Sequence, residues 1–269
     1  MKIDEFKKLL VDEPRNIKGK NEIMSKTVVQ RLNEKGVCSG KYLKSKIKSE
    51  QYEKIDIPSN SEIHNCVTGL ATQYYSEYLL NGKVNPPFGL SLKDNDEHDI
   101  IKSCLILADE TNRLRCIGAM LAPPTDFTNI EMAKKRVEIM AHNVQTFFLN
   151  NQLLLKDSES DFSLCCKVED GYYRRIFGDC DFITQNGILD IKCVKTVNLS
   201  ANIMQQMFYY LMSKYGYSKS KYVSESKSLG VYYPYLNRYC YVNLCDFSEL
   251  DLLNIVANCM FNLNIKLEV

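Results

Sequence analysis

The chain is 269 residues long, carries a net charge of +1, and is 45% hydrophobic and 25% charged. These values are typical of a globular protein with a substantial core, either one large domain or a catalytic domain with an accessory one, and they exclude a largely disordered chain. No apolar run reaches the roughly 18 residues that span a membrane. The first residues, MKIDEFKKLL, have acids and lysines between the apolar residues, which is not the pattern of a signal or transit peptide. We therefore expect a cytoplasmic, intracellular protein with no signal peptide, transmembrane segment or membrane partner.

The distribution of charges and of cysteines along the chain gives two further expectations. Residues 1–56 hold 14 Lys and Arg against 9 Asp and Glu, so this segment offers either a basic surface for phosphates or a solvated lysine-rich face. The eleven cysteines are scattered, and none forms a CxxC pair. We expect buried free thiols, because structural disulfides are rare in a reducing compartment.

The N-terminal part of the chain is predicted to be helical. Residues 1–60 show short stretches of helical spacing, and apolar residues then recur at helical spacing from Ser61 to Leu80, where Asn81-Gly82 ends the helix. Further helical segments occupy residues 99–121. Because Pro123-Pro124 cannot continue a helix, we expect a boundary there. It separates an N-terminal helical accessory region at 1–124 from a second domain at 125–269.

The second domain is predicted to combine helices and strands, which makes the fold class α/β. Thr128 caps a helix that ends near Asn150, and a later helix is capped by Asn198 or Ser200 and ends near Lys214. The other expected elements are strands at 163–169, 172–184, 229–235 and 239–244, a third core strand after Asn186-Gly187, and a helix at 247–262.

A hairpin is predicted at Asn186-Gly187. Both residues accept the positive φ angles of a type I′ turn, whose twist matches the flanking strands. If these two residues are the loop, the pairing of the strands follows by counting. The expected pairs are Gln185 with Ile188, Ile183 with Asp190, and Asp181 with Lys192.

Asp181, Asp190 and Lys192 then project from one face of the hairpin, because paired residues share a face and so do residues two apart on a strand. The two acids are diagonal neighbours, roughly 7–8 Å apart between backbones. Carboxylates this close repel each other unless a cation lies between them, and their hard oxygens suit Mg²⁺ or Mn²⁺. The ammonium can position a water or stabilise charge on a phosphoryl oxygen. The alternative is a surface hairpin with chance charge pairs.

Asp181 and Asp190-Ile191-Lys192 resemble the D…(D/E)xK core of the PD-(D/E)XK nuclease superfamily. Gly178, three residues before the first acid, and Gln205-x3-Tyr209 on the following helix are similar to its RecB-like branch. The sequence departs from the name-giving pattern at Cys180, which stands where that pattern has proline. The resemblance covers about residues 128–246, and it implies that the second domain is an αβββαβ restriction-endonuclease-like nuclease core.

By this resemblance the protein is a metal-dependent nuclease that hydrolyses phosphodiester bonds, most commonly in DNA, as an exonuclease or endonuclease of DNA processing or defence. Asp181 and Asp190 would hold Mg²⁺ or Mn²⁺, and Lys192 would orient the water. Gln205 and Tyr209 would guide the substrate strand. The alternatives are an RNA-cleaving defence or toxin nuclease and a catalytically inactive nucleic-acid-binding module. Intact acids and lysine argue against the inactive module, because a dead site need not hold repelling carboxylates together.

Three positions stay open. In the superfamily the helix before the first core strand often supplies an acid, so Glu138 is either a third metal ligand or an exposed glutamate that pairs with Lys134 or Lys135. Asp179 shares the parity of Asp181 and is either a supporting residue or an alternative ligand. The pair Gln206 and Tyr210 repeats the spacing of Gln205 and Tyr209 one position later, so either pair can face the site.

Basic side chains around the hairpin are expected to contact the phosphates of a nucleic acid partner, with DNA favoured over RNA. They are Arg174, Arg175, Lys195, Lys219 and Lys221. The sequence indicates no particular protein partner or oligomeric state.

Overall fold

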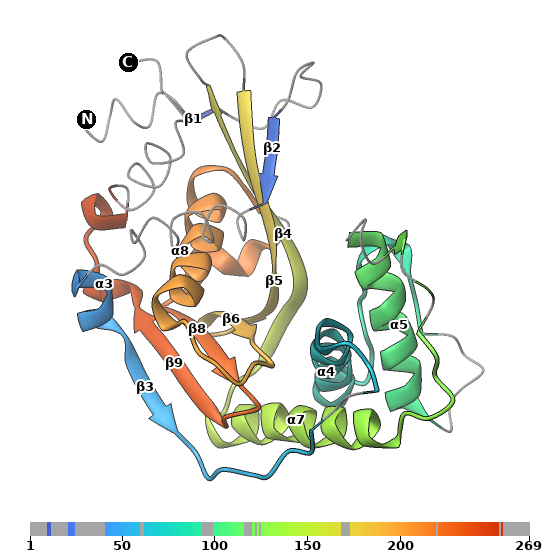
Figure 1. Ribbon diagram of the computed structural model, residues 1–269. Helices are drawn as coiled ribbons and strands as arrows, with labels where there is room; N and C mark the ends of the chain where they lie inside the picture. Colours follow the sequence, from blue (N-terminus) through green and yellow to red (C-terminus); the bar gives the residue numbers. More distant parts are fainter. Residues whose placement is uncertain are drawn as a thin grey trace.

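The structure of the protein, a computed structural model, describes residues 10–11, 21–24, 41–59, 62–92, 99–115, 120–121, 123, 125–167, 173–218, 220–252 and 254. For residues 10–11, 21–24, 41–42, 159–160, 165–167 and 173–175 it describes the backbone alone. This part of the chain forms one mixed sheet with helices on both faces, an α/β architecture (Figure 1). None of the helices within it is long and apolar enough to cross a membrane.

The sheet is mostly antiparallel and has the strand order β1-β4-β5-β6-β8-β9-β3, with β2 beside β5 and β7 beside β4. Among the described strands, the parallel pairs are β2 with β5 and β6 with β8. The strands are β1 (Leu10–Val11), β2 (Asn21–Met24), β3 (Lys48–Gln51), β4 (Leu155–Lys167), β5 (Tyr173–Thr184), β6 (Gly187–Ile191), β7 (Tyr217–Ser218), β8 (Ser228–Tyr233) and β9 (Arg238–Asn243).

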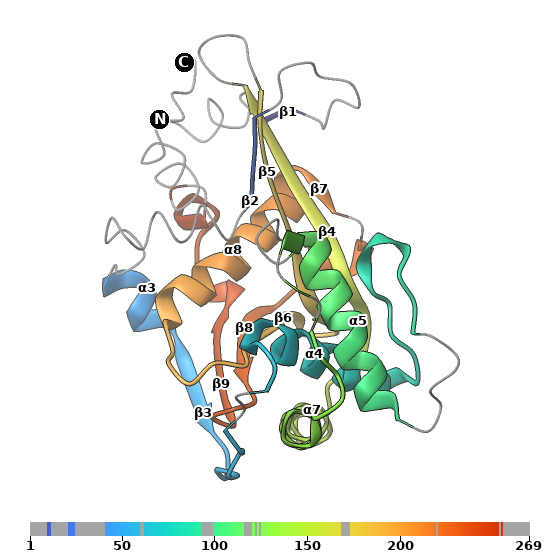
Figure 2. The ribbon, with the colours of Figure 1, turned by 45° about the vertical axis from the view of Figure 1, so that its right-hand side comes forward.

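Helices cover both faces of this sheet, as the two views in Figures 1 and 2 show. Helix α8 packs on one face against β4, β5, β6 and β8. Helix α7 packs on the other face, where Phe147 and Phe148 contact Tyr232 and Phe182, and α4 and α5 extend that layer. The helices are α3 (Lys41–Lys46), α4 (Asn65–Asn81), α5 (Ile100–Arg115), α7 (Glu131–Asn150) and α8 (Leu199–Tyr215), with short 3₁₀ turns η2 (Pro87–Gly89), η4 (Lys221–Glu225) and η5 (Leu244–Asp246).

Capping residues set the ends of the helices that frame the site. Gly82 ends α4 with φ 75°, a left-handed conformation that glycine adopts without strain, and its N–H donates to the carbonyl of Tyr78 at 2.8 Å. The Asn198 side chain begins α8 by accepting a hydrogen bond from the N–H of Ala201 at 3.3 Å. Both of these ends confirm the sequence prediction. Helix α4 is capped by His64, whose ring nitrogen Nδ1 accepts from the N–H of Cys66 at 3.2 Å.

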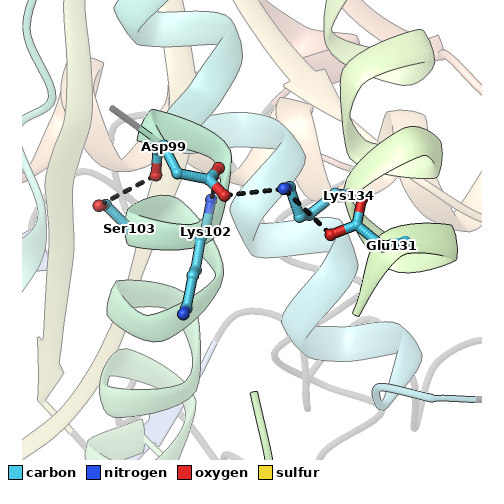
Figure 3. A network of polar contacts seen from close by, with 5 residues as sticks. All are labelled: Asp99, Lys102, Ser103, Glu131 and Lys134. Carbon is cyan, nitrogen blue, oxygen red and sulfur yellow. Dashed lines mark hydrogen bonds and ion pairs between the residues drawn. The ribbon is translucent and has the colours of Figure 1, made fainter. Parts of the chain in front are cut away.

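A network of polar contacts joins the start of α5 to the first turn of α7 (Figure 3). Lys134 Nζ lies 2.7 Å from the carboxylate of Asp99 and 3.3 Å from that of Glu131. Asp99 also accepts a hydrogen bond from the N–H of Lys102 at 3.0 Å. Partial burial is the largest single influence and raises the pKa of Asp99, but the hydrogen bonds from Lys134 and Lys102 and the charges of these two lysines together outweigh it and lower the pKa of this acid. Lys134 thus pairs with Asp99 and Glu131, and Glu138 is exposed to solvent on α7.

The register of the β5–β6 hairpin was predicted wrongly, by two residues. The turn consists of Gln185 and Asn186, and Gly187 already belongs to β6. The observed pairs are Thr184 with Gly187, Ile183 with Ile188, and Phe182 with Leu189.

The packing of Gly187 against β8 accounts for the shift. Its φ is 141°, and a Cβ on this residue would lie 2.0 Å from the carbonyl oxygen of Ser228. The glycine is therefore required by a close approach of two strands, and not by a type I′ loop. The hydroxyl of Thr184 closes the observed turn by accepting from the N–H groups of Asn186 and Gly187 at 3.2 and 3.3 Å. A shift of two residues leaves each side chain on its expected face, because strands alternate with period two.

Other differences concern the ends of elements and the N-terminal part. Strand β4 begins at Leu155, well before the strand expected at 163–169. The first 60 residues, expected to be helical, contribute strands β1, β2 and β3. These strands join those of residues 125–269, so one sheet contains strands from both sides of the proposed boundary at residue 124. Of the helix expected at 247–262, residues 247–252 and 254 are described, and 249–252 and 254 are helical.

Candidate active site

The two predicted acids lie where the β5–β6 ladder ends. The last pair of the ladder is Phe182 and Leu189, and the next residues are Asp181 on β5 and Asp190 on β6. The carboxylate of Asp181 accepts a hydrogen bond from the N–H of Ile191 at 2.6 Å. This bond continues the contact between the strands beyond the ladder and holds the Asp181 carboxylate beside β6. Asp190 is 1% exposed, so its charge lies in the interior.

Lys192 provides the positive charge for this buried acid. Its Nζ forms an ion pair with Oδ2 of Asp190, and within the described part of the chain that oxygen has no hydrogen-bond partner besides the ammonium. The lysine side chain is 26% exposed, so the ammonium lies closer to solvent than the carboxylate it pairs with. Burial by itself would lower the pKa of Lys192, but the charges of Asp190 and Asp181 outweigh it and raise the pKa. Lys192 is therefore a cation at neutral pH.

Helix α8 brings Gln205 and Tyr209 to the same place. The two residues are one turn apart, and the side-chain nitrogen of Gln205 donates a hydrogen bond to the Tyr209 hydroxyl at 2.7 Å. Both side chains are buried. Burial raises the pKa of Tyr209 well above its ordinary value, and the neighbouring carboxylates of Asp190, Asp179 and Asp181 raise it further. The hydroxyl therefore keeps its proton close to the acids.

The alternative pair, Gln206 and Tyr210, lies elsewhere. Gln206 is fully buried, and neither polar atom of its side chain has a hydrogen-bond partner in the described part of the chain. Burial and the charge of Glu249, a residue beyond β9, raise the pKa of Tyr210. Of the two pairs that the sequence left open, Gln205 and Tyr209 are the ones beside the acids.

Two residues that the sequence analysis did not single out also belong to this cluster. Tyr233 at the end of β8 is fully buried, and its hydroxyl accepts a hydrogen bond from Asn202 of α8 at 2.8 Å. Burial raises the pKa of Tyr233 to about 12, and the charges of Asp190 and Lys192 both act on its hydroxyl. The strand order is the signal that identifies Tyr233, because β8 pairs in parallel with β6 and ends next to the ion pair.

Asp179 is held by a different element. Its carboxylate forms an ion pair with Arg115, at the end of α5, over 2.6 Å. This contact ties β5 to α5 two residues before Asp181. Asp179 thus lies close enough to influence Tyr209, while its own oxygen pairs with an arginine.

Glu138 is not brought to the two acids. It is exposed on α7, where it lines a small cavity with Ile55 and His142. Among the residues that the structure describes, no three His, Cys, Asp or Glu side chains are grouped as metal ligands. The described site therefore offers a pair of carboxylates, Asp181 and Asp190, and no described third acid is placed with them as a metal ligand.

The predicted phosphate contacts are spread more widely. Arg174 and Arg175 belong to the part of β5 that pairs with β2, roughly 20 Å along the strand from Asp181. Lys195 and Lys221 are both exposed. The Lys195 ammonium lies 5.3 Å from the ring centre of Tyr235, and the Lys221 ammonium lies 5.3 Å from that of Tyr222. Lys219 lies outside the described residues.

The donor set suits a hard divalent cation. Mg²⁺ is commonly held by one or two carboxylates, and water and substrate phosphates complete its shell. Asp181 and Asp190 provide two such carboxylates, and the partner of the buried Asp190 oxygen is itself a positive charge, the ammonium of Lys192. A soft metal fits less well, because burial raises the pKa of the neighbouring Cys193 thiol to about 12 and keeps it protonated.

The structure thus gathers five of the predicted residues at the end of one hairpin and leaves Glu138 apart. The five are Asp181, Asp190, Lys192, Gln205 and Tyr209. Comparisons of the sequence with models of known protein families and with curated proteins find no match.

Proposed function

We propose that the protein is a metal-dependent nuclease that hydrolyses phosphodiester bonds, with DNA as its main substrate and Mg²⁺ or Mn²⁺ as its cation. One observation carries the proposal: a buried aspartate, a second aspartate and a charged lysine meet at the end of the β5–β6 ladder. A purely structural ion pair requires one acid and one base. The second carboxylate adds repulsion that a bound cation would offset.

We also propose that α7, β4, β5, β6, α8 and β8 form an αβββαβ core of the restriction-endonuclease-like kind. The chain order of these elements supports the proposal. So does the parallel pairing of β6 with β8, because α8 then serves as the crossover helix between two neighbouring parallel strands. Strands β1, β2 and β3 would be additions to this core.

The acids and the lysine have separate roles in this mechanism. Asp181 and Asp190 would hold the cation, which when bound supplies a Lewis acid for the phosphoryl group. Lys192 keeps three N–H donors, and its ion pair with Asp190 occupies a part of them. The ammonium can therefore also donate to the attacking water or to the phosphoryl oxygen on which charge develops. Its raised pKa keeps this donor charged across the neutral range.

Tyr209 and Gln205 would orient the substrate strand. The Tyr209 hydroxyl accepts the hydrogen bond from Gln205, so its own hydrogen is available for another acceptor. Its raised pKa keeps that hydrogen in place. A phosphate oxygen beside the acids is an acceptor of the right kind. The buried position of both side chains fixes their rotamers before the substrate arrives.

Cleavage assays test the proposal directly. Linear and circular duplex DNA, single-stranded DNA and RNA are each incubated with the purified protein in Mg²⁺, in Mn²⁺ and in EDTA. We expect metal-dependent cleavage of DNA that Asp190→Asn reduces at least about 10²-fold, because the variant removes a carboxylate while keeping the shape of the side chain. Asp126→Asn removes an exposed acid of the α7 layer and is expected to cleave at the wild-type rate.

The outcomes also separate the alternatives. Undiminished cleavage in EDTA, or by Asp190→Asn, contradicts the metal-dependent site. Cleavage of RNA alone would identify an RNA-directed nuclease that uses the same residues. Metal-independent binding of nucleic acid with no cleavage in any condition would indicate the inactive module.

A further inference from the structure

Arg136 carries a buried positive charge and has no role in the mechanism proposed above. It lies on α7, is 4% exposed, and its Nε has no hydrogen-bond partner in the described part of the chain. No described carboxylate forms an ion pair with it. An ion buried without a counter-charge carries a large desolvation penalty. A guanidinium of this kind can bind an anion that supplies the missing counter-charge.

A second cation and an aromatic ring accompany Arg136. The centre of the guanidinium lies 5.4 Å from the ring centre of Tyr235, and Lys195 Nζ lies 5.3 Å from the same ring. Tyr235 follows Pro234 in the turn between β8 and β9. This turn is fixed to α7 by a hydrogen bond from Asn143 to the carbonyl of Pro234 at 3.0 Å. Two like charges are thus directed to one ring by elements far apart in the sequence.

This cluster adjoins the candidate active site. The thiol of Cys193, the residue after Lys192, is under the influence of Asp181, Arg136 and Lys192 together. Lys195 follows three residues after Lys192 on the same segment. Arg136 therefore lies near the hairpin end that carries the acids, and Lys195 joins it through the shared contact with the Tyr235 ring.

We propose that Arg136, Lys195 and Tyr235 form a phosphate-binding subsite that holds a backbone phosphate of the nucleic acid next to the one that is cleaved. This inference rests on the proposed function for the identity of the ligand. Arg136 supplies a planar fork of donors suited to phosphate oxygens, and Lys195 supplies a mobile charge at the rim. The Tyr235 ring holds both cations through cation–π contacts until the phosphate binds.

Binding in the absence of metal tests the subsite separately from catalysis. A fluorescent single-stranded oligonucleotide is titrated with protein in EDTA at several salt concentrations, with inorganic phosphate as competitor. We expect Arg136→Gln and Lys195→Ala each to weaken binding and to reduce the slope of log affinity against log salt by about one unit. Arg136→Lys is expected to keep the slope, because it retains the charge.

Lys214→Ala is the matched control. Its ammonium lies 5.5 Å from the ring centre of Tyr215 but has Glu249 as a neighbouring carboxylate at 3.8 Å, so the slope should be that of wild type. Wild-type slopes for both Arg136→Gln and Lys195→Ala overturn the subsite, whether or not the protein cleaves DNA. If Arg136→Gln does not fold, the exposed Lys195 decides. Absence of cleavage in Mg²⁺ overturns the proposed function and leaves a reduced slope as evidence for the anion subsite.

Discussion

Single residues at the end of the β5–β6 ladder serve both stability and chemistry. Asp190 is buried and needs a cation, and Lys192 supplies one while remaining 26% exposed. Removing one partner of a buried pair typically costs about 3–5 kcal/mol, because an uncompensated charge remains. We therefore expect Lys192 to contribute to the stability of the metal-free protein as well as to catalysis. If its role were purely catalytic, its removal would leave the stability unchanged.

Replacing Lys192 by methionine tests both roles. The variant keeps the length of the side chain and loses the charge, so cleavage in Mg²⁺ should slow by about 10²–10³-fold. In EDTA its free energy of unfolding should fall by about 3 kcal/mol. Urea denaturation and single-turnover kinetics measure the two effects.

The double variant Lys192→Met/Asp190→Asn is the control for the ion pair. It should regain most of the stability, because neither charge remains buried, and it should stay inactive. A single variant with wild-type stability and wild-type cleavage rate would show that this hairpin is not the catalytic centre.

At the level of elements, the site depends on how β6 is inserted between β5 and β8. Strand β6 is five residues long, fully buried, and paired on both edges. Its position fixes Asp190 relative to Asp181 on one side and Tyr233 on the other. Gly187 lets the strand begin this close to β8, since a Cβ there would lie 2.0 Å from the Ser228 oxygen.

Gly187→Ala is expected to lower the free energy of unfolding by more than about 1 kcal/mol, because the added methyl group meets backbone that cannot move independently. Gly82→Ala is the matched comparison. Gly82 also has a positive φ, 75°, but a Cβ there meets nothing within 4 Å, so its cost should be about 1 kcal/mol of backbone strain. Urea denaturation of the two variants measures the difference, and equal costs would show that the close approach of β8 is not limiting.

At the scale of the whole molecule, the described residues form a sheet with helices on both faces, and the interior between these layers is rich in tyrosine. Apolar clusters lie between α8 and the sheet, between α7 and the sheet, and among α4, α5 and α7. Tyr74, Tyr209, Tyr232 and Tyr233 are buried in these layers. Burial raises the pKa of Tyr233 to about 12, and it raises the pKa of Tyr232 as well.

These tyrosines make the fold sensitive to high pH. A tyrosine in the unfolded chain loses its proton near pH 10, whereas Tyr233 in the folded protein keeps it to about pH 12. The stability that this difference provides is fully present below about pH 10 and is lost as pH rises toward 12. For Tyr233 alone the loss amounts to at most about 3 kcal/mol.

We therefore expect the absorbance of tyrosinate from the buried rings to rise together with the loss of circular dichroism, in one cooperative step above pH 10. Tyr233→Phe should shift that step to higher pH. Ionisation of all tyrosines near pH 10 with the fold intact would contradict this account.

The sequence by itself determined the features that depend on neighbours along the chain. Helical spacing located α4, α5, α7 and α8 within a few residues, and the caps at Gly82 and Asn198 follow from local hydrogen bonding. Alternation along β5 and β6 assigned Asp181, Asp190 and Lys192 to one side. That assignment survived the error in register, because a shift of two residues does not change the face.

The tertiary structure decided what depends on partners distant in sequence. The hairpin register follows from the contact of Gly187 with Ser228. The place of Tyr233 beside the ion pair follows from the order of β6 and β8. Glu138 is exposed, while Arg136 on the same helix is buried near the acids, because the orientation of α7 is fixed by its packing on the sheet and α4. Local patterns specify which residues share a face, and packing between elements specifies which faces meet.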